Sequence, residues 1–313
     1  MSTYGVLLMT YGSPANDDDV ASYMTRVRGG RVPADETVAD FRRRYQIIGG
    51  SPLIRITQAQ AAKVERILDG EAVAGAGMRF SDPSILEVAR SLVARGATSI
   101  VGIIISPQYS PIIMGGYDAA LKAVSDELGV PARVVPGWHR EPAFIAAMAG
   151  RVIAGLERFP AEARDHVPVL MTAHSLPKRV VDREPGFVDD LRETAQLIAS
   201  AAGLPRERWH FCYQSAGHSP EEWLKPDMLE VLPELAARGH RHALVAPVQF
   251  FGDHLETLYD IDIAGKAQAE SGGITHFARV PAPNSDDDIC QALASVGRGF
   301  AAQWLATPAG AMR

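Results

Sequence analysis

The chain has 313 residues, of which 47% are hydrophobic and 22% are charged, and this globular composition suits one large or two ordinary domains. A formal net charge of −6 argues against a nucleic-acid-binding protein, and the lack of an uninterrupted apolar run of about 18 residues argues against an integral membrane segment. Two cysteines, Cys212 and Cys290, are too few for a disulfide framework or an all-cysteine zinc site, so we expect a cytoplasmic protein.

The N-terminal residues, MSTYGVLLMTYGSP, lack the charged and apolar regions of a signal peptide and predict a first strand. From there, short β-rich runs alternate with amphipathic segments of helical length. The predicted strands are residues 4–9, 73–79, 99–105, 132–135, 168–172, 208–213, 243–248 and 275–280. The predicted helices are residues 16–27, 35–45, 53–69, 84–95, 117–129, 141–158, 187–202, 226–238, 255–270 and 287–304. This alternation predicts an α/β fold with parallel sheets covered on both faces.

The sequence contains a weak internal repeat. The stretch GVLLMTYGSP near the start resembles VPVLMTAHSLP in the middle, and SIVGIIISPQYS resembles HALVAPVQFFGDH in its placement. The repeat favours two Rossmann-like halves, residues 1–150 and 151–313, with a cleft between them. In such sheets ligands bind outside the carboxyl ends of the strands, so we expect the site there.

One predicted strand ends on a histidine, in the stretch VPVLMTAHSLPKRV at residues 167–180. His174 is either a satisfied polar residue at a strand end or a metal ligand and proton acceptor, because imidazole titrates near neutral pH. No second histidine lies at ligand spacing, and an HExxH motif is missing. A closed zinc site is therefore not expected.

A row of acidic residues occurs in FFGDHLETLYDID, residues 250–262. Asp253 and Glu256 have the spacing of a helix capping box, which is the structural interpretation. Asp260 follows Glu256 four residues on, where like charges on one helix face repel each other. Such a row is also suited to guiding a cation along the helix, and spacing alone leaves both interpretations open.

Arginines cluster in two stretches, MTRVRGGRVP at residues 24–33 and the three arginines of 42–44. A solvated basic face is one interpretation. Recognition of carboxylates or phosphates is the other, because the guanidinium group matches both in shape and charge. Neither GxGxxG nor GxxxxGK[ST] occurs, so the sequence does not support nucleotide binding.

Three motifs, AHSLP, YQS…WLKPD and DHLETLYDID, follow one another in an order and at intervals that resemble the ferrochelatase family. TYGSP near the N-terminus and RYQIIGGSPL extend the resemblance over nearly the whole chain. It implies two chelatase-like halves with a porphyrin cleft, and a lyase that inserts Fe2+ into a porphyrin while two pyrrole protons leave. It also implies that His174 and Glu256 face each other as metal ligands and catalytic residues.

Within that family, TYGSP, the short N-terminus and the lack of a transmembrane tail look most like the coproporphyrin III ferrochelatases of Gram-positive-type bacteria. The resemblance makes Tyr11 an axial ligand of the product iron. The residues that it places on the porphyrin and its propionates are Arg28, Arg44, Tyr45, Ser51 and Tyr117. It implies porphyrin and ferrous iron as partners, with the next haem-pathway enzyme, and we expect a monomer. No cofactor beyond the substrate iron is expected, because two cysteines cannot hold the four-cysteine [2Fe–2S] cluster of some relatives.

The chain departs from the family pattern in several places. IIGGSPL is one residue shorter than the commoner form, which bears on the contact of Ser51, and Ala264 stands where another carboxylate often continues the acidic row. The alternatives are a protoporphyrin IX ferrochelatase, a sirohydrochlorin-type cobaltochelatase and a non-catalytic haem carrier. The pairing of His174 with Glu256 argues against the carrier, which needs no proton acceptor.

Overall fold

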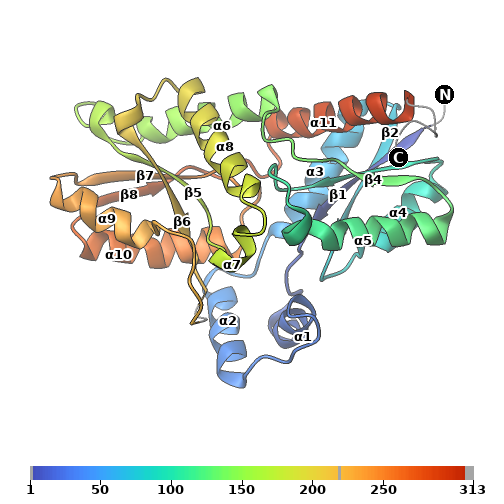
Figure 1. Ribbon diagram of the computed structural model, residues 1–313, viewed down its shortest axis with the longest axis horizontal. Coiled ribbons are helices and arrows are strands. Elements are labelled where there is room, and N and C mark those ends of the chain that lie inside the picture. Colours follow the sequence, from blue (N-terminus) through green and yellow to red (C-terminus); the bar gives the residue numbers. More distant parts are fainter. Residues whose placement is uncertain (1–2, 218–219, 307–313) are drawn as a thin grey trace. The chain divides into compact units, whose positions relative to one another are not determined.

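The computed structural model describes residues 3–217 and 220–306, which form two compact units. The first unit is Met1–Ala143 with Asn284–Arg313, and the second is Phe144–Pro283. Each unit contains one four-stranded parallel sheet flanked by helices (Figure 1), so the expected α/β class with two parallel-sheet halves is confirmed. Within the described ranges, no helix is long and apolar enough to cross a membrane.

The sheet of the first unit has the order β2-β1-β3-β4, and all its pairs are parallel. Its strands are β1 (Tyr4–Thr10), β2 (Ala72–Met78), β3 (Ile100–Ile104) and β4 (Ala132–Val134). Every residue of β1 and β3 is buried, which explains their almost uninterrupted apolar sequences. The carboxyl ends of β1 and β2 lie side by side, because Thr10 pairs with Met78.

The helices of the first unit cover both faces of its sheet (Figure 1). They are η1 (Asp17–Asp19), α1 (Val20–Val27), α2 (Asp35–Ile47), α3 (Leu53–Leu68), α4 (Ile85–Ala94), α5 (Pro111–Leu128) and α11 (Asp287–Ala306). Helices α3 and α11 pack together on one face, and α4 and α5 pack together on the other. Helices α1 and α2, which lie between β1 and α3 in the sequence, pack against each other as a separate pair.

The second unit repeats this architecture with the strand order β6-β5-β7-β8. Its strands are β5 (Val169–His174), β6 (Trp209–Gln214), β7 (His242–Pro247) and β8 (His276–Arg279). Its helices are α6 (Pro142–Glu157), η2 (Arg164–His166), α7 (Lys178–Val181), α8 (Gly186–Ala201), η3 (Arg206–Arg208), α9 (Met228–Ala237), the π-helix η4 (Glu256–Gly265) and α10 (Lys266–Ser271). Leu170 of β5, Leu232 of α9, Val245 of β7 and Ile274, which lies between α10 and β8, belong to one apolar core.

The C-terminal segment belongs to the first unit, although the sequence analysis assigned it to the second of two consecutive halves. Helix α11 packs on α3 and β3. Lys63 Nζ lies 2.6 Å from Asp287 Oδ1, and Arg298 Nη2 lies 2.8 Å from Glu71 Oε1. The amphipathic pattern of 287–304 predicts a helix, but it does not tell which apolar surface that helix covers.

All eight predicted strands are present to within two residues at each end, whereas two helical predictions need correction. Helix α5 begins at Pro111 instead of 117, because the Ser110 hydroxyl accepts a hydrogen bond from the Ile113 N–H at 3.2 Å. Glycines 115 and 116 lower the helix propensity of this turn. A Cβ atom at Gly116 would lie 1.8 Å from Nη2 of Arg79, so a larger residue there would displace the Arg79 side chain. The predicted helix 255–270 is the π-helix η4 followed by α10, and the short helix α7 was not predicted.

At the outer edge of β2, an ion pair between Glu65 of α3 and Arg95 binds the backbone of Ala74. The Ala74 N–H donates to Glu65 Oε2 at 2.7 Å, and Arg95 Nη1 donates to the Ala74 carbonyl at 3.3 Å. Arg95 Nη2 and Glu65 Oε1 are 2.5 Å apart. The pair therefore takes the place of a neighbouring strand at an edge that would otherwise be open to another chain. Burial opposes ionisation of Glu65, but Arg95 and the Ala74 N–H hold its pKa below the usual range.

We expect Glu65→Gln to lower the free energy of unfolding by about 1 kcal/mol at pH 7, because the pair is partly exposed and screened. A carboxyl whose pKa is lowered by folding stabilises the protein above its unfolded pKa, and this stabilisation is lost as pH falls through the folded pKa. The difference from wild type should therefore shrink below about pH 4. Urea unfolding at several pH values measures it, with Glu127→Gln, which removes the exposed partner of Arg90, as control. A difference that is constant with pH would contradict the expectation.

Candidate functional site

His174 is the last residue of β5, at the carboxyl end of a central strand. Its backbone N–H donates to Gln249 Oε1 at 3.1 Å, and its ring Nδ1 lies in close contact with the Ser175 carbonyl oxygen. A carbonyl only accepts hydrogen bonds, so Nδ1 carries a proton. The other ring nitrogen, Nε2, faces Glu256, and the His174 side chain is 28% exposed.

Glu256, the first residue of η4, lies between two imidazole rings. Its Oε1 is 3.6 Å from His174 Nε2, and its Oε2 is 3.7 Å from His254 Nε2. His254 Nδ1 lies 2.9 Å from the Gly252 carbonyl oxygen, which fixes the same tautomer as in His174. Oε2 of Glu256 is buried and has no hydrogen-bond partner among the residues described. The structure thus brings His174 and Glu256 together, as expected, and adds His254.

The charges in this cluster favour an ionised carboxylate. Burial raises the pKa of Glu256, but the adjacent His174 and His254 outweigh it and lower the pKa to about 2. Burial lowers the pKa of His254, but the Glu256 carboxylate outweighs this effect and raises it. Glu256 is therefore an anion at neutral pH, and its partners are groups able to hold a proton.

The distances leave room for a cation or a proton between the carboxylate and the imidazoles. Separations of 3.6 and 3.7 Å are too long for direct hydrogen bonds. Two ligands that bind one ion at about 2.1 Å each are themselves about 3.0–3.6 Å apart. Imidazole nitrogen and carboxylate oxygen both ligate first-row divalent metals and both accept protons. The cluster can therefore bind a divalent cation and exchange protons beside it.

The π-helix corrects the capping-box interpretation of the acidic row. Leu255 occupies the N-cap position of η4 without a side-chain cap, and the Asp253 carboxylate instead accepts a hydrogen bond from Arg279 Nη2 at 3.0 Å. A π-helix closes its hydrogen bonds five residues apart, so Glu256 and Asp260, four residues apart, still lie on roughly the same face of η4. Single π-helical turns occur frequently at functional sites, which agrees with the position of Glu256.

In the first unit, an aromatic group lies next to the end of β1. Tyr11 follows β1 directly and is 42% exposed. Its ring centroid is 5.1 Å from that of Phe80 and 6.3 Å from that of Tyr117 on α5. Tyr117 is almost completely buried, and burial raises the pKa of its phenol. Two of the predicted porphyrin contacts therefore come together at this edge of the sheet.

Arg79 lies in the middle of this aromatic group and was missed by the sequence analysis. Its guanidinium carbon is 4.7 Å from the ring centroid of Phe80, 5.4 Å from that of Tyr117 and 5.9 Å from that of Tyr11. In the part of the chain that the structure describes, no carboxylate pairs with it. A half-buried guanidinium of this kind is a candidate anion site. The available signal was an arginine at the last position of the predicted strand 73–79, at the end where parallel sheets bind ligands.

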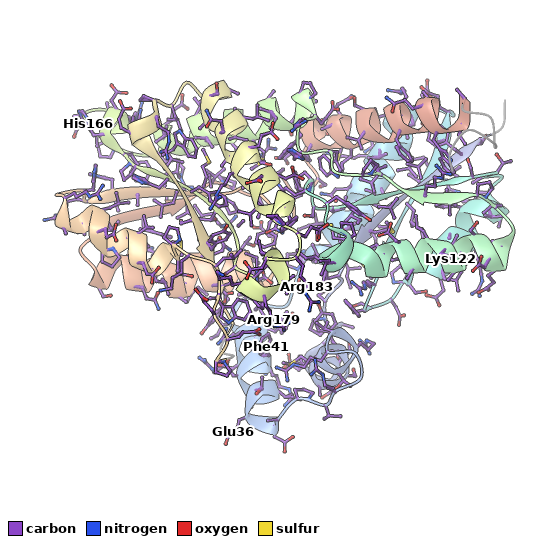
Figure 2. All side chains as sticks on the ribbon, in the orientation of Figure 1. Glu36, Phe41, Lys122, His166, Arg179 and Arg183 are labelled. Atoms are coloured by element: carbon purple, nitrogen blue, oxygen red, sulfur yellow. The ribbon has the colours of Figure 1, made fainter. Side chains whose placement is uncertain are left out.

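The other predicted porphyrin contacts lie on α1, α2 and the loop that follows α2. Arg28 is exposed where α1 ends. The Arg44 guanidinium lies 5.5 Å over the ring of Phe41, which is labelled on α2 in Figure 2, and the adjacent Tyr45 is buried. Ser51 lies in the loop before α3 and is partly buried. A substrate role for these four residues stays a prediction.

Comparisons with known proteins identify relatives over most of the chain. The family model described as Ferrochelatase matches residues 3–299. A ferrochelatase of Herpetosiphon aurantiacus is 38% identical over 301 residues, which cover 94% of this chain and 98% of that protein. A coproporphyrin III ferrochelatase of Listeria innocua is 33% identical over 300 residues, which cover 93% of this chain and 96% of that protein.

Solved structures share the fold at low sequence identity. SirB from Bacillus subtilis with Fe3+ has a TM-score of 0.55 at 11% identity, and the match covers 96% of this chain and 98% of that one. CbiX, described as the terminal enzyme for biosynthesis of sirohaem in denitrifying bacteria, has a TM-score of 0.53 at 13% identity. That match covers 94% of this chain and 98% of CbiX. These neighbours confirm the chelatase-like architecture expected from the sequence.

Proposed function

The chain belongs to the ferrochelatase family, and we propose that its own reaction is the insertion of Fe2+ into coproporphyrin III to give coprohaem. Family membership makes it a lyase-type metal-insertion enzyme of porphyrin biosynthesis, with a porphyrin and a metal ion as substrates. The observation that carries the proposal is the Glu256 carboxylate, held 3.6 Å from His174 and 3.7 Å from His254. Relatives named coproporphyrin III ferrochelatases, at 33–35% identity, support the choice of substrate.

The proposed mechanism divides the work between the carboxylate and the imidazoles. Metallation replaces two pyrrole protons with one Fe2+ ion. Glu256, with a pKa of about 2, stays ionised and attracts the cation, but it is too weak a base to accept the protons well. The Nε2 atom of His174, whose Nδ1 already donates to Ser175, is placed to accept them one at a time, and the partly exposed ring can release each proton to water before it accepts the next. The buried Oε2 atom, which has no hydrogen-bond partner within residues 3–217 and 220–306, offers an open position for the incoming ion.

We propose that the porphyrin is held by Tyr11, Arg28, Arg44, Tyr45, Ser51 and Tyr117, with Arg79 added from the structure. Coproporphyrin carries four propionates, and arginine is the side chain best suited to pair with carboxylates. Arg79 lies between aromatic rings, which suit the flat face of a macrocycle. The exposed Tyr11 phenol is available as an axial ligand of the product iron.

The remaining parts of the proposal concern cofactors and partners. We propose that the enzyme needs no cofactor beyond its substrate iron, because its two cysteines are too few for a four-cysteine cluster. We further propose that it works as a monomer in the cytoplasm and passes coprohaem to the next haem-pathway enzyme. A non-catalytic carrier is disfavoured, because a carrier does not require a buried carboxylate between two imidazoles.

Anaerobic assays with Fe2+ and coproporphyrin III test the proposal. We expect loss of the free-base absorption bands and formation of coprohaem at a rate far above that of the uncatalysed reaction. Parallel assays with Co2+ and sirohydrochlorin test the cobaltochelatase alternative. Binding of coproporphyrin III without accelerated metallation would support a carrier and contradict the proposed reaction.

A further inference from the structure

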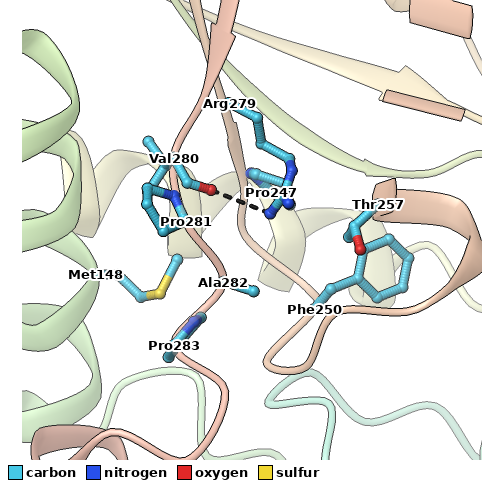
Figure 3. A pocket seen from close by; sticks show the side chains of 9 residues that line it. All are labelled: Met148, Pro247, Phe250, Thr257, Arg279, Val280, Pro281, Ala282 and Pro283. Carbon is cyan, nitrogen blue, oxygen red and sulfur yellow. Dashed lines mark hydrogen bonds between the residues drawn. The ribbon is translucent and has the colours of Figure 1, made fainter. Parts of the chain in front are cut away.

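Arg279, the last residue of β8, bridges two carboxylates of the second unit. Its Nε and Nη2 atoms donate to Asp262 Oδ1 and Oδ2, both at 2.8 Å, in a bidentate pair. Its Nη2 also donates to Asp253 Oδ1 at 3.0 Å, and its Nη1 donates to the Val280 carbonyl at 3.2 Å (Figure 3). The side chain is only 8% exposed, so these are charge-assisted bonds with little competition from water.

In the sequence, the two carboxylates lie on either side of His254 and Glu256. Asp253 immediately precedes His254, and Asp262 lies within η4, beyond Glu256. One guanidinium therefore ties together both flanks of the segment that carries Glu256. The Thr257 hydroxyl donates to the His254 carbonyl at 3.0 Å and accepts from the His254 N–H at 3.0 Å. The π-helical segment, which has an uncommon backbone form, is therefore held both by Arg279 of β8 and by Thr257 within the segment itself.

The surroundings of Arg279 favour a structural use of its charge. Figure 3 shows it in the lining of a small pocket, together with Met148, Pro247, Phe250 and residues 280–283. The space between these side chains does not admit even a water-sized sphere, so it does not accommodate a porphyrin. The Arg279 charge is instead neutralised by Asp253 and Asp262, which also raise the pKa of its guanidinium despite burial.

We propose that Arg279 is a positioning residue for metal insertion. It holds the segment from Asp253 to Asp262 in place and so fixes Glu256 at its distances from His174 and His254. The inference rests on the proposed role of Glu256. Lysine cannot replace the arginine, because an ammonium group cannot bind Asp262 through two parallel bonds while it also reaches Asp253.

The test compares Arg279→Lys and Arg279→Met with a matched control, Arg298→Met. Arg298 makes an equivalent bidentate pair with Glu71, with both bonds at 2.8 Å, in the first unit. We expect Arg279→Lys to lower kcat by at least about tenfold, because small misplacements of catalytic groups cost one to two orders of magnitude in rate. The KM for coproporphyrin III should change less than about twofold, since Arg279 does not bind the porphyrin. Arg298→Met should change neither value.

Hydrogen–deuterium exchange of the full-length protein measures positioning independently of activity. Peptides covering residues 250–265 should exchange faster in Arg279→Lys, and peptides covering β5 should not. Unchanged exchange in 250–265 would overturn the proposal, as would faster exchange with an unchanged kcat. A fall in kcat that only matches the unfolded fraction in a thermal melt would overturn it too. If Arg279→Met does not fold, Arg279→Lys still carries the test. Failure of the proposed function shows separately, as a wild-type protein that binds coproporphyrin III without accelerating its metallation, and failure of the role of Glu256 shows as full activity of Glu256→Gln.

Discussion

Replacing His174 with alanine should lower kcat for iron insertion by about a thousandfold, within the range that a positioned proton acceptor contributes. The substitution removes the Nε2 atom that lies 3.6 Å from Glu256 Oε1. It leaves the backbone of β5 intact, because the His174 N–H still donates to Gln249. The measurement is single-turnover metallation of coproporphyrin III under anaerobic conditions. A fluorescence titration of the porphyrin should give a Kd within about threefold of wild type, since the groups proposed to bind it lie elsewhere.

The control for this prediction is His166→Ala. His166 is an exposed histidine of η2 in the same unit, and it is labelled in Figure 2. Its replacement should leave both kcat and Kd unchanged. A His174→Ala enzyme that retains more than about a tenth of the wild-type kcat would remove His174 from the proposed mechanism.

Replacing Glu256 with glutamine should lower kcat by about a hundredfold and raise the KM for Fe2+. Glutamine keeps the shape of the side chain but removes the negative charge that faces both imidazoles. Without that charge, burial dominates at His254, and its pKa should fall below that in the wild type. The rates are measured over a series of Fe2+ concentrations, so that the loss of cation attraction is separated from the loss of turnover.

Glu270→Gln is the matched control, because Glu270 is an exposed residue of α10 whose partner is Lys266. It should behave as wild type at every Fe2+ concentration. If Glu256→Gln kept a kcat within about threefold of wild type, an electrostatic role for Glu256 would be contradicted.

The strands were predictable because parallel strands are buried on both faces and therefore have apolar sequences, as β1 and β3 show. The unit to which the C-terminal helix belongs was less predictable. Helix α11 joins the first unit through contacts with α3 and β3, and its amphipathic pattern fits any apolar surface. The π-helix was missed for a related reason. Asp253 has the spacing of a cap, but its carboxylate is bound by Arg279, 26 residues away in the sequence.

The candidate site was predicted in part. His174 and Glu256 followed from the family resemblance, and the structure supplies the distance between them. His254 stands in the same motif, DHLETLYDID, but residues two apart on a regular helix do not face each other. His254 can face Glu256 because it precedes η4 and its ring is held by the Gly252 carbonyl. Arg79 was missed because its importance depends on rings brought together from β1 and α5.

The assignment of coproporphyrin III as substrate is tested most directly by a competition experiment. Wild-type protein receives Fe2+ under anaerobic conditions with coproporphyrin III and protoporphyrin IX at equal, limiting concentrations. The ratio of the two haem products gives the ratio of kcat/KM values. The arginine-rich proposed site predicts at least about ten times more coprohaem than protohaem, a difference of about 1.4 kcal/mol. Equal yields, or an excess of protohaem, would contradict the assignment.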